Sequence, residues 1–260
     1  MSPFRLDLLT GKVALVTGGG SGIGRGVALS FAAHGAAVAV MGRKRENLDE
    51  TVALIEEAGG RALAVPADVR KPEEVDAAIA AVVATFGGLD IVVNGAAGNF
   101  LAPIVGMSTN AFRTVVDIDL VGTFNVSKAA QPHLAKNGGA IVNLSATLQY
   151  LGTPLMAHAA AAKAGVDSFT RTCAVEWGSL NIRVNGIAPG PIGDTEGARR
   201  LMPGELAAKI EARVPLGRLG TIEDVALAAV FLASDASAWT TGAILVVDGG
   251  AWLASGRIDL

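Results

Sequence analysis

The chain has 260 residues, of which 51% are hydrophobic and 17% charged, a composition that excludes an intrinsically disordered protein. It carries 21 basic and 24 acidic residues, a formal net charge of −3, with no block of like charge to attract a nucleic acid or an anionic membrane. The single cysteine, Cys173, excludes an intrachain disulfide and a cysteine-rich metal site, and no histidine–carboxylate set has metal-ligand spacing, so no metal is expected.

Short apolar segments rich in β-branched residues alternate with helical stretches along the chain. The expected strands are 13–17, 37–41, 62–65, 91–94, 140–144, 182–187 and 243–247, and helical stretches such as 24–34, 46–58 and 73–86 lie between them. Continuously apolar strands are typical of a parallel sheet that is covered on both faces. The alternation predicts an α/β fold, a doubly wound Rossmann-type parallel sheet of about seven strands, in one domain that spans residues 1–260.

Residues 193–218 interrupt this alternation, because they contain prolines and several charges. We expect this segment to be a substrate lid over the carboxyl edge of the sheet. The N-terminal apolar run is too short for a signal peptide, and no apolar run reaches the roughly 18 residues of a membrane span. The C-terminal tripeptide is not a peroxisomal address, so we expect a cytoplasmic protein.

A glycine-rich turn with the spacing Gly-x-x-x-Gly-x-Gly follows the first expected strand, and a helix begins directly after it. Glycines there allow the backbone to approach a pyrophosphate, whose charge the helix N-terminus stabilises. A plain tight turn is the alternative, but the position at the first strand of a βαβ unit favours a dinucleotide site. The turn residues expected to bind the cofactor are Gly18, Gly20, Ser21, Gly22, Ile23 and Gly24.

The end of the second expected strand indicates which nicotinamide cofactor is bound. An acidic residue there would bind the ribose 2′-hydroxyl and select NAD, but this strand is followed by Arg43, Lys44 and Arg45. Arg43 can pair with a 2′-phosphate through two hydrogen bonds. A solvated basic helix start is the alternative, although basic charge at a helix N-terminus opposes the helix dipole. The sequence therefore favours NADPH.

Further motifs extend this pattern over nearly the whole chain, which resembles the short-chain dehydrogenase/reductase family. They are Asp68-Val69, Asn94-Gly95-Ala96-Ala97-Gly98, Lys163, Pro189-Gly190-Pro191-Ile192 and Val247-Asp248-Gly249-Gly250. The resemblance implies that Asp68 and Val69 flank the adenine, that Asn94 lies by the adenine-side ribose, and that the protein is a homotetramer. The other residues that it implies for cofactor binding are Lys163, Pro189, Gly190, Ile192 and Thr195.

The catalytic set of most family members is incomplete in this sequence. Those members reduce carbonyls with a Ser, a Tyr, a Lys and an Asn, whereas the Ser and Tyr positions here are Ala146 and Ala159. The Asn position is Asp119, so only Lys163 is kept. Either the chain binds a dinucleotide without catalysis, or its reaction needs no phenol. Reduction of a carbon–carbon double bond conjugated to a thioester is such a reaction, because the charge moves to the thioester oxygen.

The substituted positions themselves resemble the peroxisomal type of 2,4-dienoyl-CoA reductase. The matching segments are 96–101, 117–119, 158–159 with Lys163, 189–192, 195–197 and 249–253. The resemblance implies NADPH-dependent reduction of 2,4-dienoyl-CoA to 3-enoyl-CoA. Lys163 would bind the nicotinamide ribose and Asp119 would pass a proton through ordered water, which makes both candidate catalytic residues. Arg70, Phe100 and Arg200 would bind the acyl-CoA. A trans-2-enoyl-CoA reductase is the close alternative.

Three further side chains near the expected site have weaker assignments. Asp117 and Asp119 are about 200° apart around a helix, so they cannot both face the cofactor and we expect one of them in solvent. Tyr150, the one tyrosine, has the wrong register for a proton donor. His158 could orient water, although we expect a packing histidine whose hydrogen bonds are satisfied.

Overall fold

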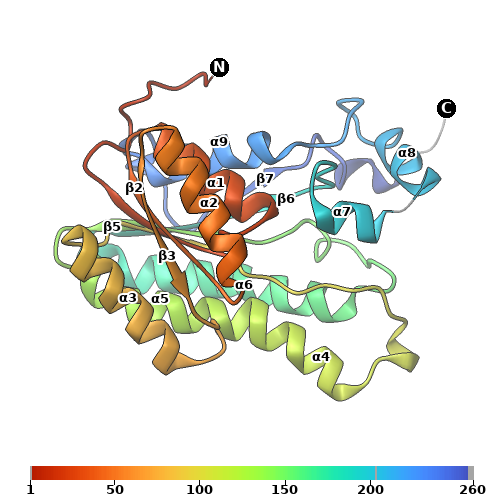
Figure 1. Cartoon of the computed structure of the whole chain (residues 1–260). Helices are drawn as coiled ribbons and strands as arrows, with labels where there is room; N and C mark the ends of the chain where they lie inside the picture. The colour runs from red at the N-terminus through yellow and green to blue at the C-terminus, as the bar shows by residue number, and fades with distance from the viewer. Residues whose placement is uncertain (1, 203, 257–260) are drawn as a thin grey trace.

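A seven-stranded parallel sheet forms the centre of this computed structural model, which describes residues 2–202 and 204–256 (Figure 1). The strands are β1 (Val13–Thr17), β2 (Ala37–Gly42), β3 (Arg61–Pro66), β4 (Ile91–Asn94), β5 (Gly139–Leu144), β6 (Ile182–Pro189) and β7 (Ile244–Val247). Their order is β3-β2-β1-β4-β5-β6-β7, and every neighbouring pair is parallel. This confirms the predicted Rossmann-type fold. The strand order reverses between β1 and β4, where such sheets form a binding crevice.

Helices cover both faces of the sheet. They are α1 (Gly22–Ala33), α2 (Arg45–Glu57), α3 (Pro72–Phe86), α4 (Thr109–Val116), α5 (Gly122–Leu134), α6 (Ala157–Trp177), α7 (Glu196–Leu201), α8 (Glu205–Glu211) and α9 (Ile222–Ala233). Successive residues of β1 alternate between two buried clusters: Ala14 and Val16 pack with α1, α2 and α9, whereas Val13 and Leu15 pack with α3, α5 and α6. The alternation follows from the two-residue period of a strand. Within the described residues, no helix is long and apolar enough to cross a membrane.

The two edge strands correct the expectation that all strands are buried on both faces. Only one residue of β3 is buried, Val65, and no residue of β7 is. An edge strand has a neighbour on one side only and is less completely covered, so its side chains remain accessible. The predicted bounds of most strands differ from the observed ones by one or two residues. The largest difference is in β6, which continues to Pro189.

The segment expected to be a lid contains α7 and α8, apart from residue 203, which lies outside the described residues. Both helices lie beyond the carboxyl ends of the strands (Figure 1). The segment is joined to the start of α9, because the Gly193 N–H donates to the Gly220 carbonyl at 2.9 Å and the Asp194 carboxylate accepts from the Ile222 N–H. It is therefore placed to cover the carboxyl edge, and its role as a lid stays a prediction.

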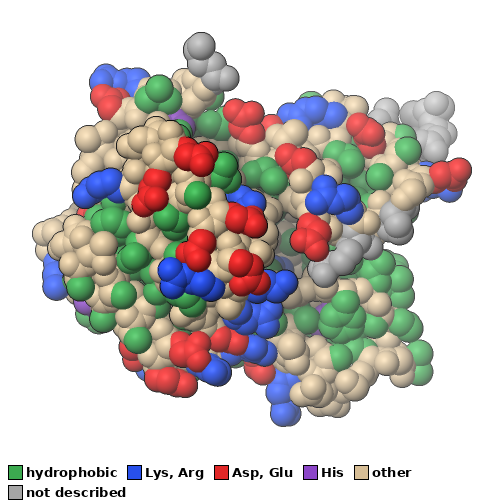
Figure 2. All heavy atoms as spheres, viewed as in Figure 1, with side chains coloured by type: hydrophobic (Ala, Val, Ile, Leu, Met, Phe, Trp, Pro, Cys, Tyr) green, Lys and Arg blue, Asp and Glu red, His purple; other side chains and the backbone are tan. Residues whose placement is uncertain are grey.

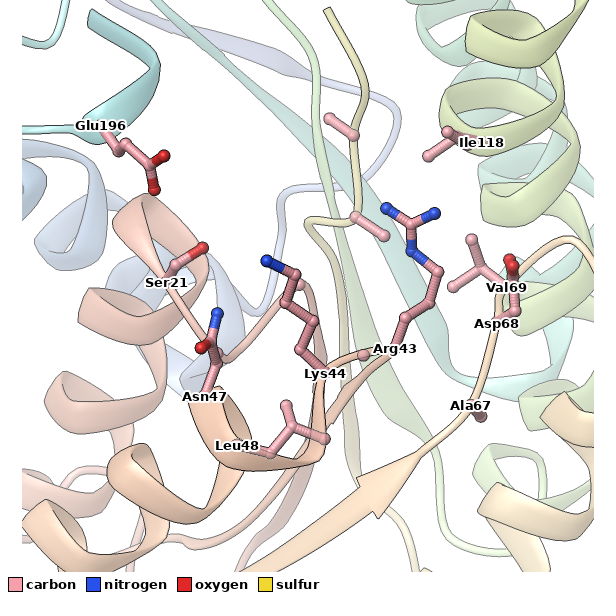
Figure 3. Close-up of a pocket in the computed structure, with 15 residues that line it drawn as sticks. Ser21, Arg43, Lys44, Asn47, Leu48, Ala67, Asp68, Val69, Ile118 and Glu196 are labelled. Carbon is pink, nitrogen blue, oxygen red and sulfur yellow. The ribbon is translucent and has the colours of Figure 1, made fainter. Parts of the chain in front are cut away.

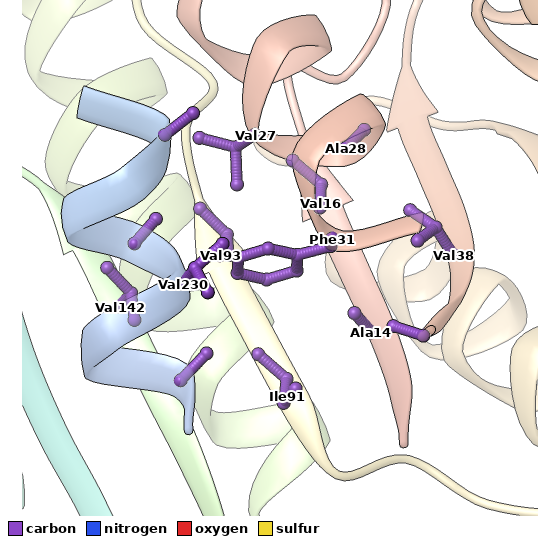
Figure 4. Close-up of a cluster of buried hydrophobic side chains, with 14 of the residues drawn as sticks. Ala14, Val16, Val27, Ala28, Phe31, Val38, Ile91, Val93, Val142 and Val230 are labelled. Atoms are coloured by element: carbon purple, nitrogen blue, oxygen red, sulfur yellow. The ribbon is translucent and has the colours of Figure 1, made fainter. Parts of the chain in front are cut away.

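Phe31 provides a test of the core on one face of the sheet. Its ring is fully buried among Val16, Val93 and Val230 (Figure 4). Replacing Phe31 with Ala should lower the free energy of unfolding by about 3–5 kcal/mol, because a large cavity remains. Urea denaturation followed by circular dichroism measures the change. The control is Leu54→Ala in α2, which is 43% exposed and should cost less than about 1 kcal/mol. Equal losses in the two variants would contradict this view of the core.

Candidate functional site

The glycine-rich turn between β1 and α1 is held in place by close backbone contacts. Gly18 has a φ of +69°, and a Cβ on it would lie 2.6 Å from the Gly95 carbonyl oxygen. A Cβ on Gly24 would overlap the Gly18 carbonyl oxygen, so both positions require glycine. The N-cap of α1, Ser21, makes no side-chain capping hydrogen bond, and the first turn contains no acidic residue. The N–H groups at this helix end therefore remain available to an anion such as a pyrophosphate.

Arg25 in α1 holds this turn against α2, a role that the sequence did not reveal. Its guanidinium donates to the carbonyl oxygens of Gly20 at 2.6 Å and Asn47 at 3.3 Å, and to the Thr51 hydroxyl at 3.0 Å. The Thr51 hydroxyl in turn donates to the Gly19 carbonyl at 3.0 Å. Arg25 is thus a structural cation that does not face the pocket.

Two adjoining pockets follow the carboxyl edge of the sheet from this turn. Between them, they are lined by most of the residues predicted to bind the cofactor: Gly18, Gly20, Ser21, Gly22, Ile23, Gly24, Arg43, Asp68, Val69, Lys163, Pro189 and Thr195. Gly18, Ser21 and Glu196 line both pockets, so the two form one trough across the strand-order reversal. A trough with an open helix N-terminus at its centre and cations at one end fits a dinucleotide.

Three predicted cofactor residues lie elsewhere. Asn94 is buried beneath the trough, where its amide donates to the Ser127 hydroxyl at 2.9 Å and to the Asn143 carbonyl oxygen at 2.8 Å. Its side chain therefore joins β4 to α5 and β5 and does not line the trough. Ile192 lines a neighbouring pocket together with Leu216 and other residues. Gly190 follows β6, where its N–H donates to the Val247 carbonyl at 3.0 Å.

The cationic end of the trough contains Arg43 and Lys44, whose side chains extend into the pocket (Figure 3). Neither makes a hydrogen bond or an ion pair with any residue that the structure describes. The arginine after them, Arg45, differs because it pairs with Asp49 at 2.8 Å on the surface of α2. Glu196 lines the opposite wall. Two unpaired cations in a pocket are suited to binding a phosphate.

Asp68 and Arg70 bind one another at the same end of the trough. The Arg70 guanidinium donates to both oxygens of the Asp68 carboxylate, at 2.9 Å and 3.1 Å from its Nε. These hydrogen bonds lower the pKa of Asp68 to about 2. Arg70 is therefore occupied by the residue predicted to flank the adenine, and it can reach an acyl-CoA only by exchanging this partner.

Asp119 and Lys163 form a buried ion pair at the other end. Asp119 lies in a π-helical turn, η2 (Asp117–Val121), and is 1% exposed. One carboxylate oxygen accepts from the Gly98 N–H at 2.7 Å, and the other lies 3.2 Å from Lys163 Nζ. Lys163 also donates to the Leu144 carbonyl at 2.8 Å. Asp117 is partly exposed whereas Asp119 is buried, so the two aspartates have different surroundings.

The positions of the family's tyrosine and serine have no hydroxyl. Ala159 is buried four residues before Lys163, and Ala146 follows β5. The hydroxyl of Ser145, next to Ala146 in the chain, donates to the buried Asp167 carboxylate at 2.5 Å. Tyr150 packs on Trp252 with ring centroids 5.3 Å apart, and burial together with Asp167 raises the pKa of its phenol to about 12. The phenol therefore keeps its proton at neutral pH.

His158 corrects the expectation of a packing histidine with satisfied hydrogen bonds. It is fully buried in the first turn of α6, and neither ring nitrogen has a hydrogen-bond partner among the described residues. Burial lowers the pKa of the imidazole, against the opposite effects of the Asp119 carboxylate and the Phe100 backbone. The sequence could not reveal that the ring nitrogens lack partners, because hydrogen-bond partners of a buried side chain can come from residues that are distant in the chain.

The residues expected to bind the acyl-CoA come from different segments of the chain. Phe100 packs on His158, with ring centroids 4.2 Å apart, and is 36% exposed. Arg200 belongs to α7, but its side chain lies outside the described part of the structure. A separate cleft is lined by Leu148, Ile210 and Trp252 together with residues that include Lys209 and Arg213. This mixture of apolar and cationic walls suits a ligand with a hydrocarbon chain and phosphates.

Comparisons with known proteins match the chain over nearly its whole length. The family model described as enoyl-(acyl carrier protein) reductase matches residues 18–251. A peroxisomal 2,4-dienoyl-CoA reductase of Arabidopsis thaliana that produces (3E)-enoyl-CoA is 47% identical and covers 98% of this chain and 89% of its own. A Bacillus subtilis protein named as a (2E)-enoyl-CoA-producing 2,4-dienoyl-CoA reductase is 44% identical over 93% and 97% of the two chains. The structure of a short-chain type dehydrogenase/reductase from Mycobacterium marinum has a TM-score of 0.88 at 33% identity, over 96% and 99%.

The Asp68–Arg70 pair makes a prediction about acid stability. Because the folded-state pKa of Asp68 lies below its unfolded value, the pair stabilises the fold above the unfolded pKa and loses this effect as the pH falls through about 2. Arg70→Ala should therefore raise the pKa of Asp68 toward the ordinary aspartate value, as measured by carboxyl carbon NMR. Lys71→Ala, which breaks the exposed pair with Glu74, is the control and should leave the Asp68 pKa low.

Proposed function

Because the chain belongs to the short-chain dehydrogenase/reductase family, we propose that it catalyses the NADPH-dependent reduction of a 2,4-dienoyl-CoA to a 3-enoyl-CoA. The observation that carries this proposal is Asp119 at the family's asparagine position, ion-paired with Lys163 beside alanines at the tyrosine and serine positions. A site without a hydroxyl acid is unsuited to ordinary ketone reduction. Relatives that are named for dienoyl-CoA reduction support the same choice.

The trough explains how the chain would hold its nicotinamide cofactor. The backbone N–H groups at the start of α1 would bind the pyrophosphate, and Lys163 would bind the nicotinamide ribose. Arg43 and Lys44 would pair with a 2′-phosphate, which NADPH carries and NADH lacks. When bound, the reduced cofactor supplies a hydride to the far carbon of the conjugated dienoyl group.

The chain's own residues would then have to stabilise negative charge on the substrate and deliver a proton to it. As hydride adds to the substrate, the electrons of the conjugated double bonds move to the thioester oxygen and form an enolate. A proton delivered to the α-carbon completes the reduction and leaves one double bond at the 3-position. Asp119 accepts from the Gly98 N–H and is ion-paired with Lys163, and its remaining lone pairs would hold the water that delivers this proton. Delivery to the γ-carbon would instead give a 2-enoyl product.

The acyl-CoA would lie across the cleft beneath α8. Its apolar walls, with Leu148, Ile210 and Trp252, would take the acyl chain, and Lys209 and Arg213 would attract its phosphates. Hydrophobic side chains also gather on the loop before α4 (Figure 2), where Ile104 and Val105 are largely exposed. Arg70, Phe100 and Arg200 remain proposed contacts for this substrate.

We also infer a homotetramer. Val121 and Phe124 expose apolar surface at the start of α5, and Trp239 and Leu245 do so near β7. Exposed apolar residues gathered at two separate places are suited to two kinds of subunit interface, as a tetramer with dihedral symmetry requires.

The proposed activity is tested by following NADPH oxidation with 2,4-hexadienoyl-CoA and crotonyl-CoA side by side. Turnover of the dienoyl thioester, with 3-hexenoyl-CoA as the product, supports the proposal. Turnover of crotonyl-CoA alone would favour a trans-2-enoyl-CoA reductase. NADPH binding without turnover of either substrate would indicate a dinucleotide-binding protein without this chemistry.

Arg43 is expected to determine the cofactor preference. Arg43→Gln should weaken NADPH binding by about tenfold or more, the effect of losing a charged hydrogen bond, with little change for NADH. Fluorescence titration with both cofactors measures this. The matched control is Arg45→Gln, because Arg45 pairs with Asp49 away from the pocket. If Arg43→Gln leaves the preference unchanged, the 2′-phosphate is not bound here.

Asp119 is expected to be essential for proton delivery. Asp119→Asn should lower kcat by about a hundredfold, the usual scale of general acid–base catalysis, while NADPH binding persists. Asp117→Asn, two residues away and partly exposed, should have little effect on kcat. Steady-state kinetics with a parallel NADPH titration separate the two properties. A fully active Asp119→Asn enzyme would remove Asp119 from the mechanism.

A further inference from the structure

The site contains one buried titratable group that the mechanism above does not use, His158. Its side chain is shielded from bulk solvent, and neither ring nitrogen makes a hydrogen bond of normal geometry with a described residue, although the Phe100 backbone acts on the ring. The carbonyl oxygen of the Asn99 side chain is also buried and unpartnered. Three unpaired polar atoms in one small region are costly to folding unless something binds them.

These atoms lie in neighbouring segments that the fold ties together. The Ala102 N–H donates to the Leu155 carbonyl at 3.0 Å, and the Phe100 ring packs on the His158 ring. The Asn99 amide nitrogen faces the Met156 sulfur at 3.8 Å. The loop after β4 is therefore fixed against the start of α6. The same loop contains Gly98, whose N–H binds Asp119.

The hydrogen-bonding capacity of this region matches a water molecule. A neutral imidazole offers one donor and one acceptor, the Asn99 carbonyl oxygen is an acceptor, and Asp119 has lone pairs beyond the two occupied by Gly98 and Lys163. Buried waters make about three such bonds. Burial lowers the pKa of the imidazole and favours its neutral form, and Lys163 is engaged with Asp119.

We propose that His158 is a positioning residue of the active site, which together with Asn99 holds the proton-carrying water against Asp119. This inference rests on the proposed function, since the water delivers the proton that completes dienoyl reduction. Asp119 polarises the water, and His158 fixes its orientation by occupying one of its hydrogen bonds. His158 itself neither donates a proton to the substrate nor touches the cofactor.

Two substitutions separate this role from a packing role. His158→Gln keeps a hydrogen-bonding side chain and loses the ring, whereas His158→Phe keeps an aromatic ring on Phe100 and loses both nitrogens. If His158 orients water, His158→Phe should lower kcat for 2,4-hexadienoyl-CoA by about tenfold or more, and His158→Gln should keep most of it. A residue that only packs predicts the reverse order, because the ring would be the important part.

The readouts are kcat, the KM for each substrate, NADPH affinity and the solvent isotope effect in heavy water. We expect His158→Phe to keep NADPH affinity and Tm while its solvent isotope effect increases, since protonation becomes slower. Where His158→Phe does not fold, His158→Met provides the apolar comparison. Wild-type kcat in the apolar variant, or a slower Gln variant, overturns the inference. Wild-type protein that binds NADPH without turning over the dienoyl thioester overturns the proposed function itself, before any variant is compared.

Discussion

The buried ion pair between Asp119 and Lys163 is the interaction on which the catalytic end of this protein depends. Its members come from the π-helical turn and from α6, and both are almost inaccessible to water. Gly98 and Leu144 bind the same pair through their backbones, so the loop after β4 and the end of β5 are joined to it. Removing one partner of a buried pair costs about 3–5 kcal/mol, because the other charge is left uncompensated. The ion pair therefore holds the π-helical turn, α6, the loop after β4 and the end of β5 in one arrangement.

The π-helical turn gives the two neighbouring aspartates different surroundings. Asp119 faces the interior, and its backbone carbonyl accepts from the Thr123 hydroxyl at 2.7 Å. Asp117 stays near the surface, where its charge acts on Arg70. Such wide turns inside helices are frequent at functional sites, where they direct one side chain inward. Here the turn places a carboxylate where most family members have an amide.

The two ends of the trough are built on different physical principles. At the cofactor end, close glycine packing opens a helix N-terminus, and Arg43 and Lys44 make no hydrogen bond or ion pair with the part of the chain that the structure describes. At the catalytic end, hydroxyl groups are absent from the two family positions, and the polar groups are buried. The proposed delivery of a proton through water held by Asp119 is consistent with protonation at carbon. The low pKa of His158 fits the same picture, since a neutral ring adds no competing charge.

Much of this protein was determined by local sequence. Each of the patterns used for prediction involves residues that are close together in the chain. The apolar strand segments and the glycine spacing after β1 predicted the Rossmann-type sheet, and the absence of a carboxylate after β2 predicted the cationic pocket. Tertiary structure alone decided the surroundings of Asn94 and His158. Asn94 turns inward to Asn143, 49 residues away in the chain. His158 is buried where Phe100, from the loop after β4, packs on its ring, and neither ring nitrogen has a geometric hydrogen-bond partner among the described residues. The hydrogen-bond partners of these buried polar groups depend on how elements distant in the chain pack together, and the spacing of residues along the chain does not specify that packing.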